Sequence, residues 1–310
     1  MDLSLRALRY IVAVADLGSV TAAARHLHVS QPAISEMIAQ LEDQLGFTLF
    51  LRHHARGVTQ TPAGARVVTE ARRLLAHAAD FARAARALGD EPAGEVALGC
   101  FVTVAPRFLP RLLSAFAARH PAITVRTEEG DQAETVGALG TGRTEVALAY
   151  DFGLPETLEA EPLLVLPPYA ALPAAHPLAR RPRLTLAEVA AALPLLLLDL
   201  PHSRDYFLGL FRAKGLEPRI AFASRSQELL RGLAGNGHGF AIQNAVSPSP
   251  FAVDGSRIAA RPLEPDLAPV RMMLLSPRGV PPRPAVRAFA AFVREAFAPG
   301  GLFDEAVLRR

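Results

Sequence analysis

The sequence predicts an α/β protein built from an all-α amino-terminal domain with a winged helix-turn-helix, one long helix, and a two-lobed α/β domain. Three observations predict this order. Apolar residues recur at helical spacing up to Leu45, residues 62–88 contain no glycine or proline after Gly64, and residues 95–298 alternate between strand and helix patterns. The 310 residues suffice for two or three domains.

The composition is typical of a globular protein with a large core, because 50% of the residues are hydrophobic and 20% are charged. The net charge of +3 is too small to indicate nucleic-acid binding by itself. The single cysteine, Cys100, excludes an intramolecular disulfide. The amino terminus lacks a signal-peptide pattern, and no apolar run is long enough for a membrane span. We therefore expect a cytoplasmic protein that does not associate with membranes.

The amino-terminal domain begins with a helix predicted over residues 4–16, which Gly18 ends. Its apolar face consists of Leu5, Leu8, Ile11, Val12 and Ala15. Residues 19–46 predict two short helices joined by a tight turn, and alanines at 22–24 allow them to approach closely. The apolar stripe of the second helix consists of Ile34, Ile38, Leu41 and Leu45. These features indicate a helix-turn-helix, although an ordinary helical hairpin shares the periodicity.

The opposite face of the second helix carries polar residues that suit contact with nucleic acid. It consists of Gln31, Pro32, Ser35, Glu36, Gln40 and Asp43. Ser30 is a typical N-cap, and Pro32 is tolerated in the first turn because its missing N–H would have no intrahelical partner. The positive end of the helix dipole suits a phosphate, and Gln31 could bond to the N6/N7 edge of adenine in a major groove.

A wing and a long helix complete the amino-terminal region. Residues 47–52 and 57–59 predict a short hairpin whose turn carries a basic cluster of Arg52, His53, His54 and Arg56. These side chains could bind phosphates, or they could simply be solvated. Residues 62 to about 88 predict one helix of about 40 Å, at about 1.5 Å per residue. Its apolar stripe, which needs a partner, consists of Val67, Leu74, Leu75 and Phe81. Residues 89–94 predict a hinge.

The helix-turn-helix and the wing match the sequence pattern of a known family, residue for residue. The matching residues are Ala-Ala-Ala-Arg-His-Leu-His-Val-Ser-Gln-Pro-Ala-Ile-Ser at 22–35, then Ile38, Leu41-Glu42, Leu45-Gly46, Leu49-Phe50, Arg52 and Thr61-Pro62-Ala63-Gly64. On these residues the domain resembles that of the LysR-type transcriptional regulators. The resemblance implies subunits paired through the long helix as a homodimer or homotetramer, a dyad-symmetric operator in double-stranded DNA, and contact with RNA polymerase. The implied DNA-binding residues are Thr21, Ser30, Gln31, Pro32, Ser35, Glu36, Arg52 and Arg56.

Two residues depart from the family pattern. Glu36 stands where many relatives have a basic or neutral residue, so it either accepts a hydrogen bond from cytosine N4 or lowers general affinity by repelling phosphate. Gln60 stands where relatives usually have leucine, which leaves the seating of the wing open.

Residues 95–298 predict alternating strands and helices, and hence a mostly parallel sheet covered by helices. The predicted strands are Glu95–Cys100, Ile123–Glu128, Glu145–Tyr150, Leu163–Leu166, Tyr169–Leu172, Leu195–Asp199, Ile220–Ser224, Gly239–Gln243 and Val270–Ser276. The predicted helices are Ala105–Arg119, Gln132–Leu139, Leu186–Ala192, Arg204–Lys214, Gln227–Ala234 and Arg283–Ala298. Proline-bearing segments at 166–168 and 264–269 indicate two crossings between lobes.

This bilobed pattern resembles the periplasmic-binding-protein-like (type 2) effector domain of the same family, so the resemblance covers nearly the whole chain. The residues that carry it are Pro110, Leu112, Phe116, His120-Pro121 and the strand at 145–149. The expected domains are a winged helix-turn-helix domain at 1–61, a linker and dimerisation helix at 62–90, and an effector-binding domain at 91–310, with lobe I at 95–166 and 270–298 and lobe II at 167–269.

Ligands of open α/β sheets bind at the carboxyl ends of strands. The residues expected there are Phe101, Val102, Thr103, Gly130, Asp131, Tyr150, His202, Ser203, Gln243 and Asn244. Thr103 and Ser203 stand before helices as N-caps would, and could direct N–H groups at a carboxylate, while His202 could add positive charge. Together these residues predict a small anionic effector and no other cofactor, although each could be a plain cap or turn residue.

The sequence therefore predicts a ligand-responsive transcriptional regulator, in which effector binding changes lobe closure and so the pairing of dimers on DNA. Two other classes stay open. An enzyme using the bilobed domain would turn over a small molecule and be sensitive to mutation at His202 or Ser203. An architectural DNA binder would not discriminate between its own promoter region and random duplex. The sequence contains no Gly-x-Ser-x-Gly motif and no zinc-ligand spacing, so no catalytic or metal-binding residue is predicted.

Overall fold

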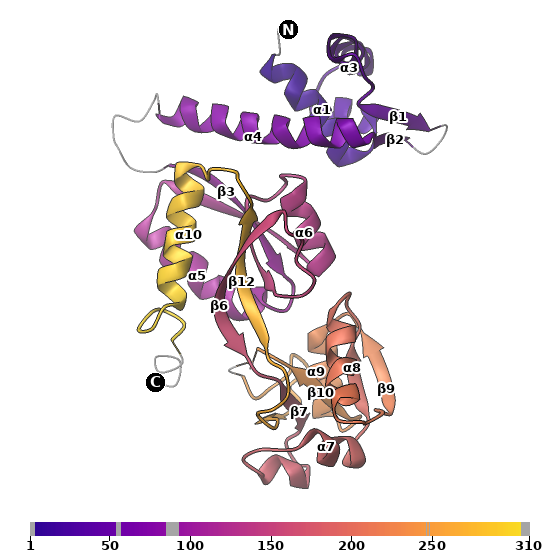
Figure 1. Cartoon of the computed structure of the whole chain (residues 1–310), viewed down its shortest axis with the longest axis vertical. Helices are drawn as coiled ribbons and strands as arrows, with labels where there is room; N and C mark the ends of the chain where they lie inside the picture. Colours follow the sequence, from indigo (N-terminus) through magenta and orange to yellow (C-terminus); the bar gives the residue numbers. More distant parts are fainter. Residues whose placement is uncertain (1–3, 54–56, 85–92, 246, 248, 305–310) are drawn as a thin grey trace.

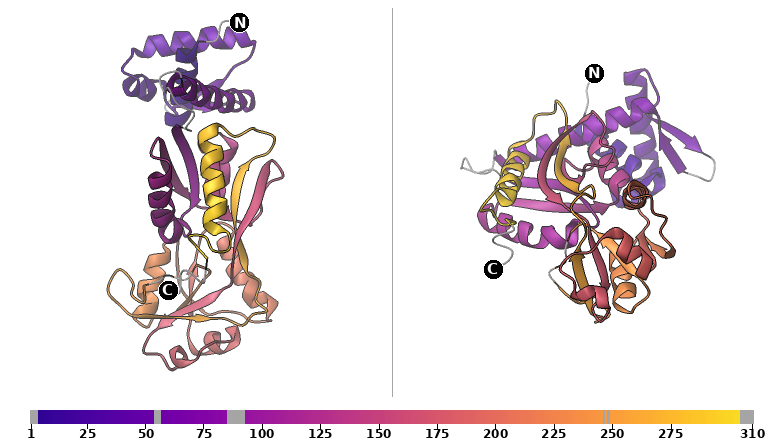
Figure 2. Two further views of the ribbon diagram at one scale, coloured as in Figure 1. Left: turned by 90° about the vertical axis from the view of Figure 1, so that its left-hand side faces the viewer. Right: turned by 60° about the horizontal axis from the view of Figure 1, so that its bottom comes forward.

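The computed structural model describes residues 4–53, 57–84, 93–245, 247 and 249–304. The molecule has three tiers along its long axis: a small helical domain, a first α/β lobe and a second α/β lobe (Figures 1 and 2). One long helix, α4 (Pro62–Ala84), lies across the end of the first lobe and carries the helical domain on its other side (Figure 1).

The helical domain contains the predicted three helices, α1 (Leu5–Leu17), α2 (Val20–His26) and α3 (Gln31–Leu45). Each begins after a serine whose hydroxyl accepts a backbone N–H of the first turn: Ser4, Ser19 and Ser30, at 3.1, 3.2 and 3.4 Å. The predicted stripe of α3 is confirmed, since Ile34, Ile38 and Leu41 are buried. The predicted face of α1 is partly wrong. Leu5 is 41% exposed because it precedes the part of α1 that the other helices cover.

The wing is a hairpin of β1 (Phe50–His53) and β2 (Gly57–Gln60), as predicted. The carboxylate of Glu42, near the end of α3, fixes its position by accepting the N–H groups of Leu49 at 2.6 Å and Phe50 at 3.2 Å. Gly64 allows α4 to start beside the wing, because a Cβ there would lie 2.0 Å from the carbonyl oxygen of Leu49. The seating of the wing is therefore fixed from both neighbouring helices.

The two halves of α4 have different surroundings. Val68 and Ala71 are buried in the core of the helical domain. Farther along, Leu74 is 52% exposed and Phe81 is 77% exposed. The described helix has 23 residues, about 35 Å at about 1.5 Å per residue. Its predicted continuation to residue 88 lies outside the described residues, and so do residues 89–92 of the hinge predicted at 89–94. The last hinge residue, Gly94, is already the first residue of a strand.

The first lobe is a five-stranded sheet in the order β4-β3-β5-β12-β6, covered by three helices. Its elements are β3 (Gly94–Phe101), α5 (Ala105–Arg119), β4 (Ile123–Gly130), α6 (Gln132–Gly140), β5 (Val146–Tyr150), β6 (Leu158–Leu166), β12 (Val270–Pro277) and α10 (Pro284–Phe297). The second lobe has the order β11-β7-β10-β8-β9. Its elements are β7 (Tyr169–Pro173), the 3₁₀ helix η1 (Pro177–Arg180), α7 (Leu186–Ala192), β8 (Leu195–Leu198), α8 (Ser203–Ala213), β9 (Ile220–Ser224), α9 (Gln227–Gly235), β10 (Phe240–Gln243) and β11 (Ile258–Pro262).

The prediction of a mostly parallel sheet is wrong. In the first lobe β3 pairs in parallel with β4 and β5, but β12 pairs antiparallel with β5 and β6. The second lobe repeats this mixture, with β7 antiparallel to β10 and to β11. The antiparallel half of each sheet arises where the chain crosses between lobes, at residues 167–168 and 263–269.

No single helix in the described parts of the chain is long and apolar enough to cross a membrane. The pair formed by α1 and α2, bent by 119°, passes that test on length and composition only.

Candidate nucleic-acid interface and interlobe cleft

The amino-terminal end of α3 projects away from the core of the helical domain. Gln31, Pro32 and Glu36 are exposed, whereas Ser35 is half-buried. The Ser30 hydroxyl caps the helix, so the first-turn N–H groups and the positive end of the dipole face outward. Glu36 does not stand alone, because its carboxylate accepts a hydrogen bond from Gln40 Nε2 at 3.3 Å.

A short turn joins α2 to α3, and both helices expose polar residues. Ala23 and Ala24 are buried, and His28 adopts a positive φ of 54° in the turn. Thr21 is exposed on α2, and so is Arg25 in its last turn. The DNA-binding residues predicted from the sequence do not include Arg25, although the sequence shows that it lies close to the turn.

The wing adds basic groups to this end of the molecule. Arg52 is exposed on β1. His53 is tied to the opposite strand, with its Nε2 2.8 Å from Thr59 Oγ1. His54 and Arg56, which the sequence places in the same basic cluster, lie outside the described residues.

A cleft of about 600 Å³ lies between the two lobes and is lined by residues of both. Four of the predicted effector residues line it: Val102, Thr103, Gly130 and Asp131. The structure places the other predicted residues outside the lining: Phe101, Tyr150, His202, Ser203, Gln243 and Asn244. The lining also contains residues that the sequence did not single out, chiefly Pro106, Arg107, Leu200, Arg225, Arg231 and Ser247.

Several of the predicted residues outside the lining contact a lining residue or lie among buried residues of the two lobes. The Tyr150 hydroxyl lies 3.2 Å from Thr103 Oγ1, and burial raises the pKa of Tyr150 well above its ordinary value. Gln243 accepts a hydrogen bond from Tyr169 at 2.6 Å. Asn244 donates to the Leu166 carbonyl at 3.0 Å, at the first crossing between lobes. Phe101 belongs to the core of the α/β domain.

Two predicted N-caps are wrong. Val104, and not Thr103, precedes α5, and no side chain caps that helix. His202 precedes α8 with a φ of 63°, so Ser203 is already the first residue of the helix and is buried. The sequence could not separate these cases, because a helix boundary uncertain by one residue moves the cap position. His202 is exposed and makes no side-chain cap hydrogen bond.

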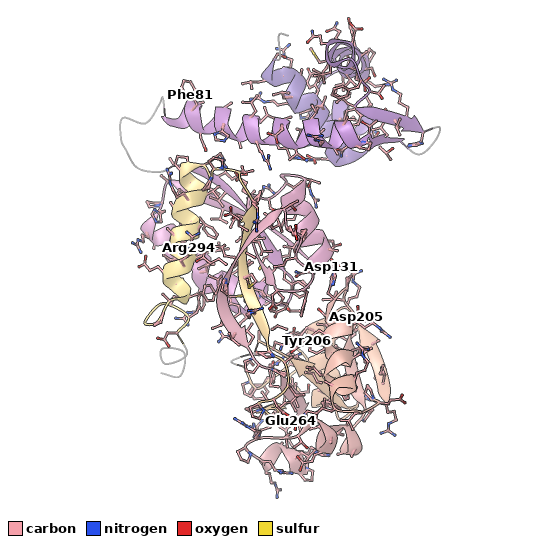
Figure 3. The ribbon with its side chains drawn as sticks, viewed as in Figure 1. Phe81, Asp131, Asp205, Tyr206, Glu264 and Arg294 are labelled. Carbon is pink, nitrogen blue, oxygen red and sulfur yellow. The ribbon has the colours of Figure 1, made fainter. Side chains whose placement is uncertain are left out.

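Among the described residues, one ion pair crosses the cleft. Arg225 Nη2, from the second lobe, lies 3.1 Å from Asp131 Oδ2 of the first lobe, whose side chain is only 6% exposed. Asp131 also caps α6 by accepting the Glu134 N–H at 3.0 Å. Asp131 lies on the side of the first lobe that faces the second (Figure 3). The carboxylate therefore holds two elements of the cleft together.

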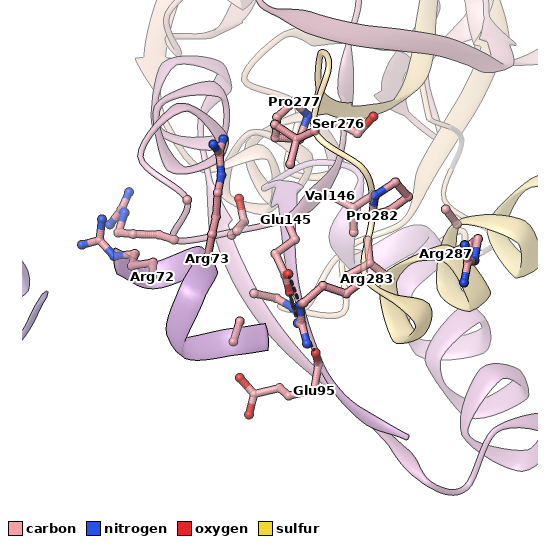
Figure 4. A pocket seen from close by; sticks show the side chains of 18 of the residues that line it. Arg72, Arg73, Glu95, Glu145, Val146, Ser276, Pro277, Pro282, Arg283 and Arg287 are labelled. Atoms are coloured by element: carbon pink, nitrogen blue, oxygen red, sulfur yellow. Dashed lines mark hydrogen bonds and ion pairs between the residues drawn. The ribbon is translucent and has the colours of Figure 1, made fainter. Parts of the chain in front are cut away.

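A second cavity, of about 950 Å³, lies between α4 and the first lobe (Figure 4). Its polar side chains mostly pair with one another. The Arg283 guanidinium binds Glu145 through two hydrogen bonds of 2.7 Å and also contacts Asp80 of α4. Arg72 of α4 donates to the Thr141 carbonyl at 2.7 Å. We regard this cavity as a contact region between the long helix and the first lobe.

Within the described residues, no group of three or more His, Cys, Asp and Glu side chains is arranged to hold a metal ion. Cys100 is buried, and burial raises the pKa of its thiol far above the ordinary value. A buried neutral thiol of this kind reacts slowly.

The chain is similar to known proteins over most of its length. Residues 89–298 match the LysR substrate binding domain, and residues 5–65 match the bacterial regulatory helix-turn-helix proteins of the lysR family. The uncharacterized HTH-type transcriptional regulator YnfL of Escherichia coli (strain K12) is 34% identical over 93% of this chain and 97% of its own length. HinK, a LysR family transcriptional regulator from Pseudomonas aeruginosa, superposes with a TM-score of 0.63 at 34% identity, covering 96% of this chain and 99% of HinK. Full-length CbnR in complex with its target DNA has a TM-score of 0.57 at 29% identity, covering 94% and 99%.

Proposed function

The chain belongs to the LysR family of transcriptional regulators, and on this premise we propose that its α3 surface binds a dyad-symmetric operator under the control of an effector in the interlobe cleft. The observation that carries the proposal is the capped, outward-facing start of α3 opposite a buried apolar stripe. The proposed DNA contacts are Thr21, Ser30, Gln31, Pro32, Ser35, Glu36 and Arg52, with Arg56 as a further phosphate contact.

The proposed active form is a homodimer or homotetramer. Leu74 and Phe81 leave an apolar stripe exposed on α4, and a second copy of that helix would cover it. Two α3 helices related by a two-fold axis would then enter successive major grooves. Such a protein would act in the cytoplasm, in contact with DNA and RNA polymerase.

The cleft is proposed to bind a small anionic effector without turning it over. The proposed direct contacts are Val102, Thr103, Gly130 and Asp131, which line the cleft. The proposed supporting roles fall to Phe101, Tyr150, His202, Ser203, Gln243 and Asn244. An effector that binds one degree of lobe closure better than another would shift the pairing of subunits, and hence their spacing on DNA.

Selection of bound fragments from sheared genomic DNA by the purified full chain tests this proposal. We expect enrichment of fragments that share a dyad of two half-sites about 10 base pairs, or a multiple, apart. An architectural binder would instead enrich no common sequence, and an enzyme of unrelated role would retain no DNA above background.

A further inference from the structure

Three arginines of the described chain line the interlobe cleft, and two of them already have carboxylate partners. Arg225 is paired with Asp131 across the cleft at 3.1 Å. Arg231 is buried, lies 3.1 Å from Glu228, and donates to two backbone carbonyl oxygens at 3.1 Å each. These two guanidinium groups are therefore compensated by the protein itself.

Arg107, in the first turn of α5, is the third arginine. It is half-buried, and no carboxylate in the described parts of the chain lies within ion-pair distance of it. Its guanidinium carbon lies 5.4 Å from the ring centre of Phe108. Burial, and next the charge of Arg111, lower the pKa of Arg107. A partly desolvated cation beside another cation is stabilised by an anion that enters the cleft.

The remaining lining limits the kind of anion. Val102, Pro106, Leu200 and Ala245 give the cleft apolar surface, and its volume of about 600 Å³ suits a small organic molecule. The other lining carboxylates, among them Asp131, would repel a second negative charge. Glu129 also lines the cleft, but its side chain is exposed, and solvent screens its charge.

We propose that the effector is a small organic acid with one carboxylate and an apolar body, and that Arg107 is the residue that binds the carboxylate. The planar guanidinium can form two parallel hydrogen bonds to a carboxylate, which fixes the orientation of the acid as well as its charge. The apolar body then contacts Val102, Pro106 and Leu200. This inference rests on the proposed function, because it assigns a ligand to the effector cleft.

Matched pairs of probes test the inference on the purified full chain. The probes are phenylacetate and isovalerate, each beside its neutral amide, with succinate as a dicarboxylate and sulfate as a simple anion. We expect at least one monocarboxylate to raise the melting temperature, and its amide, succinate and sulfate to have no effect. Calorimetry should show that Arg107→Gln weakens binding of that acid at least about tenfold, which corresponds to about 1.4 kcal/mol.

Two further variants separate binding from folding. Arg111→Gln removes the neighbouring charge one turn farther along α5 but leaves the cleft lining intact, so it should weaken binding much less than Arg107→Gln does. Arg107→Lys keeps the charge but loses the paired geometry, so it should recover part of the affinity. Circular dichroism should give the same helical content for all variants.

Specific outcomes would overturn the inference. Equal binding of acid and amide, unchanged affinity in Arg107→Gln, or no shift with either monocarboxylate would each refute it, while the genomic selection could still enrich a dyad. Conversely, carboxylate binding that depends on Arg107 together with failure of that selection would overturn the DNA part of the proposed function alone.

Discussion

Removal of the Arg283 guanidinium should destabilise the first lobe by about 3 kcal/mol. The side chain of Arg283 is 6% exposed and donates two 2.7 Å hydrogen bonds to Glu145 and one of 2.8 Å to the Glu95 carbonyl (Figure 4). Burial by itself lowers the pKa of Arg283, but the hydrogen bonds to Glu145 and Asp80 raise it above its ordinary value. Breaking a buried ion pair typically costs about 3–5 kcal/mol. The lower end applies, because Glu145 is 23% exposed and keeps a hydrogen bond from the Ala97 N–H.

The matched control is Arg287→Gln, because Arg287 lines the same cavity but is exposed and has no ion pair within the described residues. The chain has no tryptophan, so circular dichroism should follow thermal unfolding. Arg283→Gln should lower the melting temperature of the first lobe by about 6–12 °C, at about 2–4 °C per kcal/mol. Arg287→Gln should leave that melting temperature unchanged. Equal transitions in the two variants would show that the Arg283 network does not stabilise the lobe.

Three other predictions concern single sites. Gly64→Ala should destabilise the helical domain by about 3 kcal/mol, because the added Cβ would collide with the wing backbone. Gly137→Ala lies in open space on α6 and should stabilise the first lobe by up to about 1 kcal/mol. Thermal unfolding in which Gly64→Ala is as stable as Gly137→Ala would contradict this prediction. Burial raises the pKa of Tyr169 and of Tyr206 to about 12. As the pH rises, these tyrosines therefore ionise in the unfolded chain before they ionise in the folded one, so the free energy of unfolding should fall between about pH 10 and 12. Tyr206→Phe should reduce that fall. An ultraviolet titration in which both tyrosines ionise near pH 10 in the native protein would refute this prediction. The Cys100 thiol should resist a thiol reagent in the native protein and react after unfolding; rapid native labelling would show that it is accessible.

Local signals predicted most of the secondary structure. Helices 105–119 and 186–192 and strand 220–224 have the bounds that the sequence predicts. Thr185 caps the helix at 186–192, and His120-Pro121 follows the end of the helix at 105–119. Strand β11 was missed because Ile258–Pro262 is short, weakly β-forming and ends in proline. The first half of β6 was missed because it contains Pro162, which is tolerated there on an edge strand.

The mixed sheets and the cleft depend on pairings that the linear pattern does not contain. Strand β12 joins β5 and β6 across more than a hundred residues, which an alternation of strands and helices cannot indicate. The prediction that residues at the strand ends line the cleft was therefore only partly correct. Arg231 illustrates the difficulty, because an arginine on an amphipathic helix is usually solvated, yet here the second lobe buries it.

The central claim, that the start of α3 enters a groove of duplex DNA, is tested most directly by the affinity of a double variant for a selected operator. Gln31→Ala with Ser35→Ala should weaken binding to that operator by at least about tenfold while leaving binding to random duplex nearly unchanged. Gln44→Ala, an exposed position near the other end of the same helix, should bind as the wild type does. Wild-type operator affinity in the double variant would contradict the account.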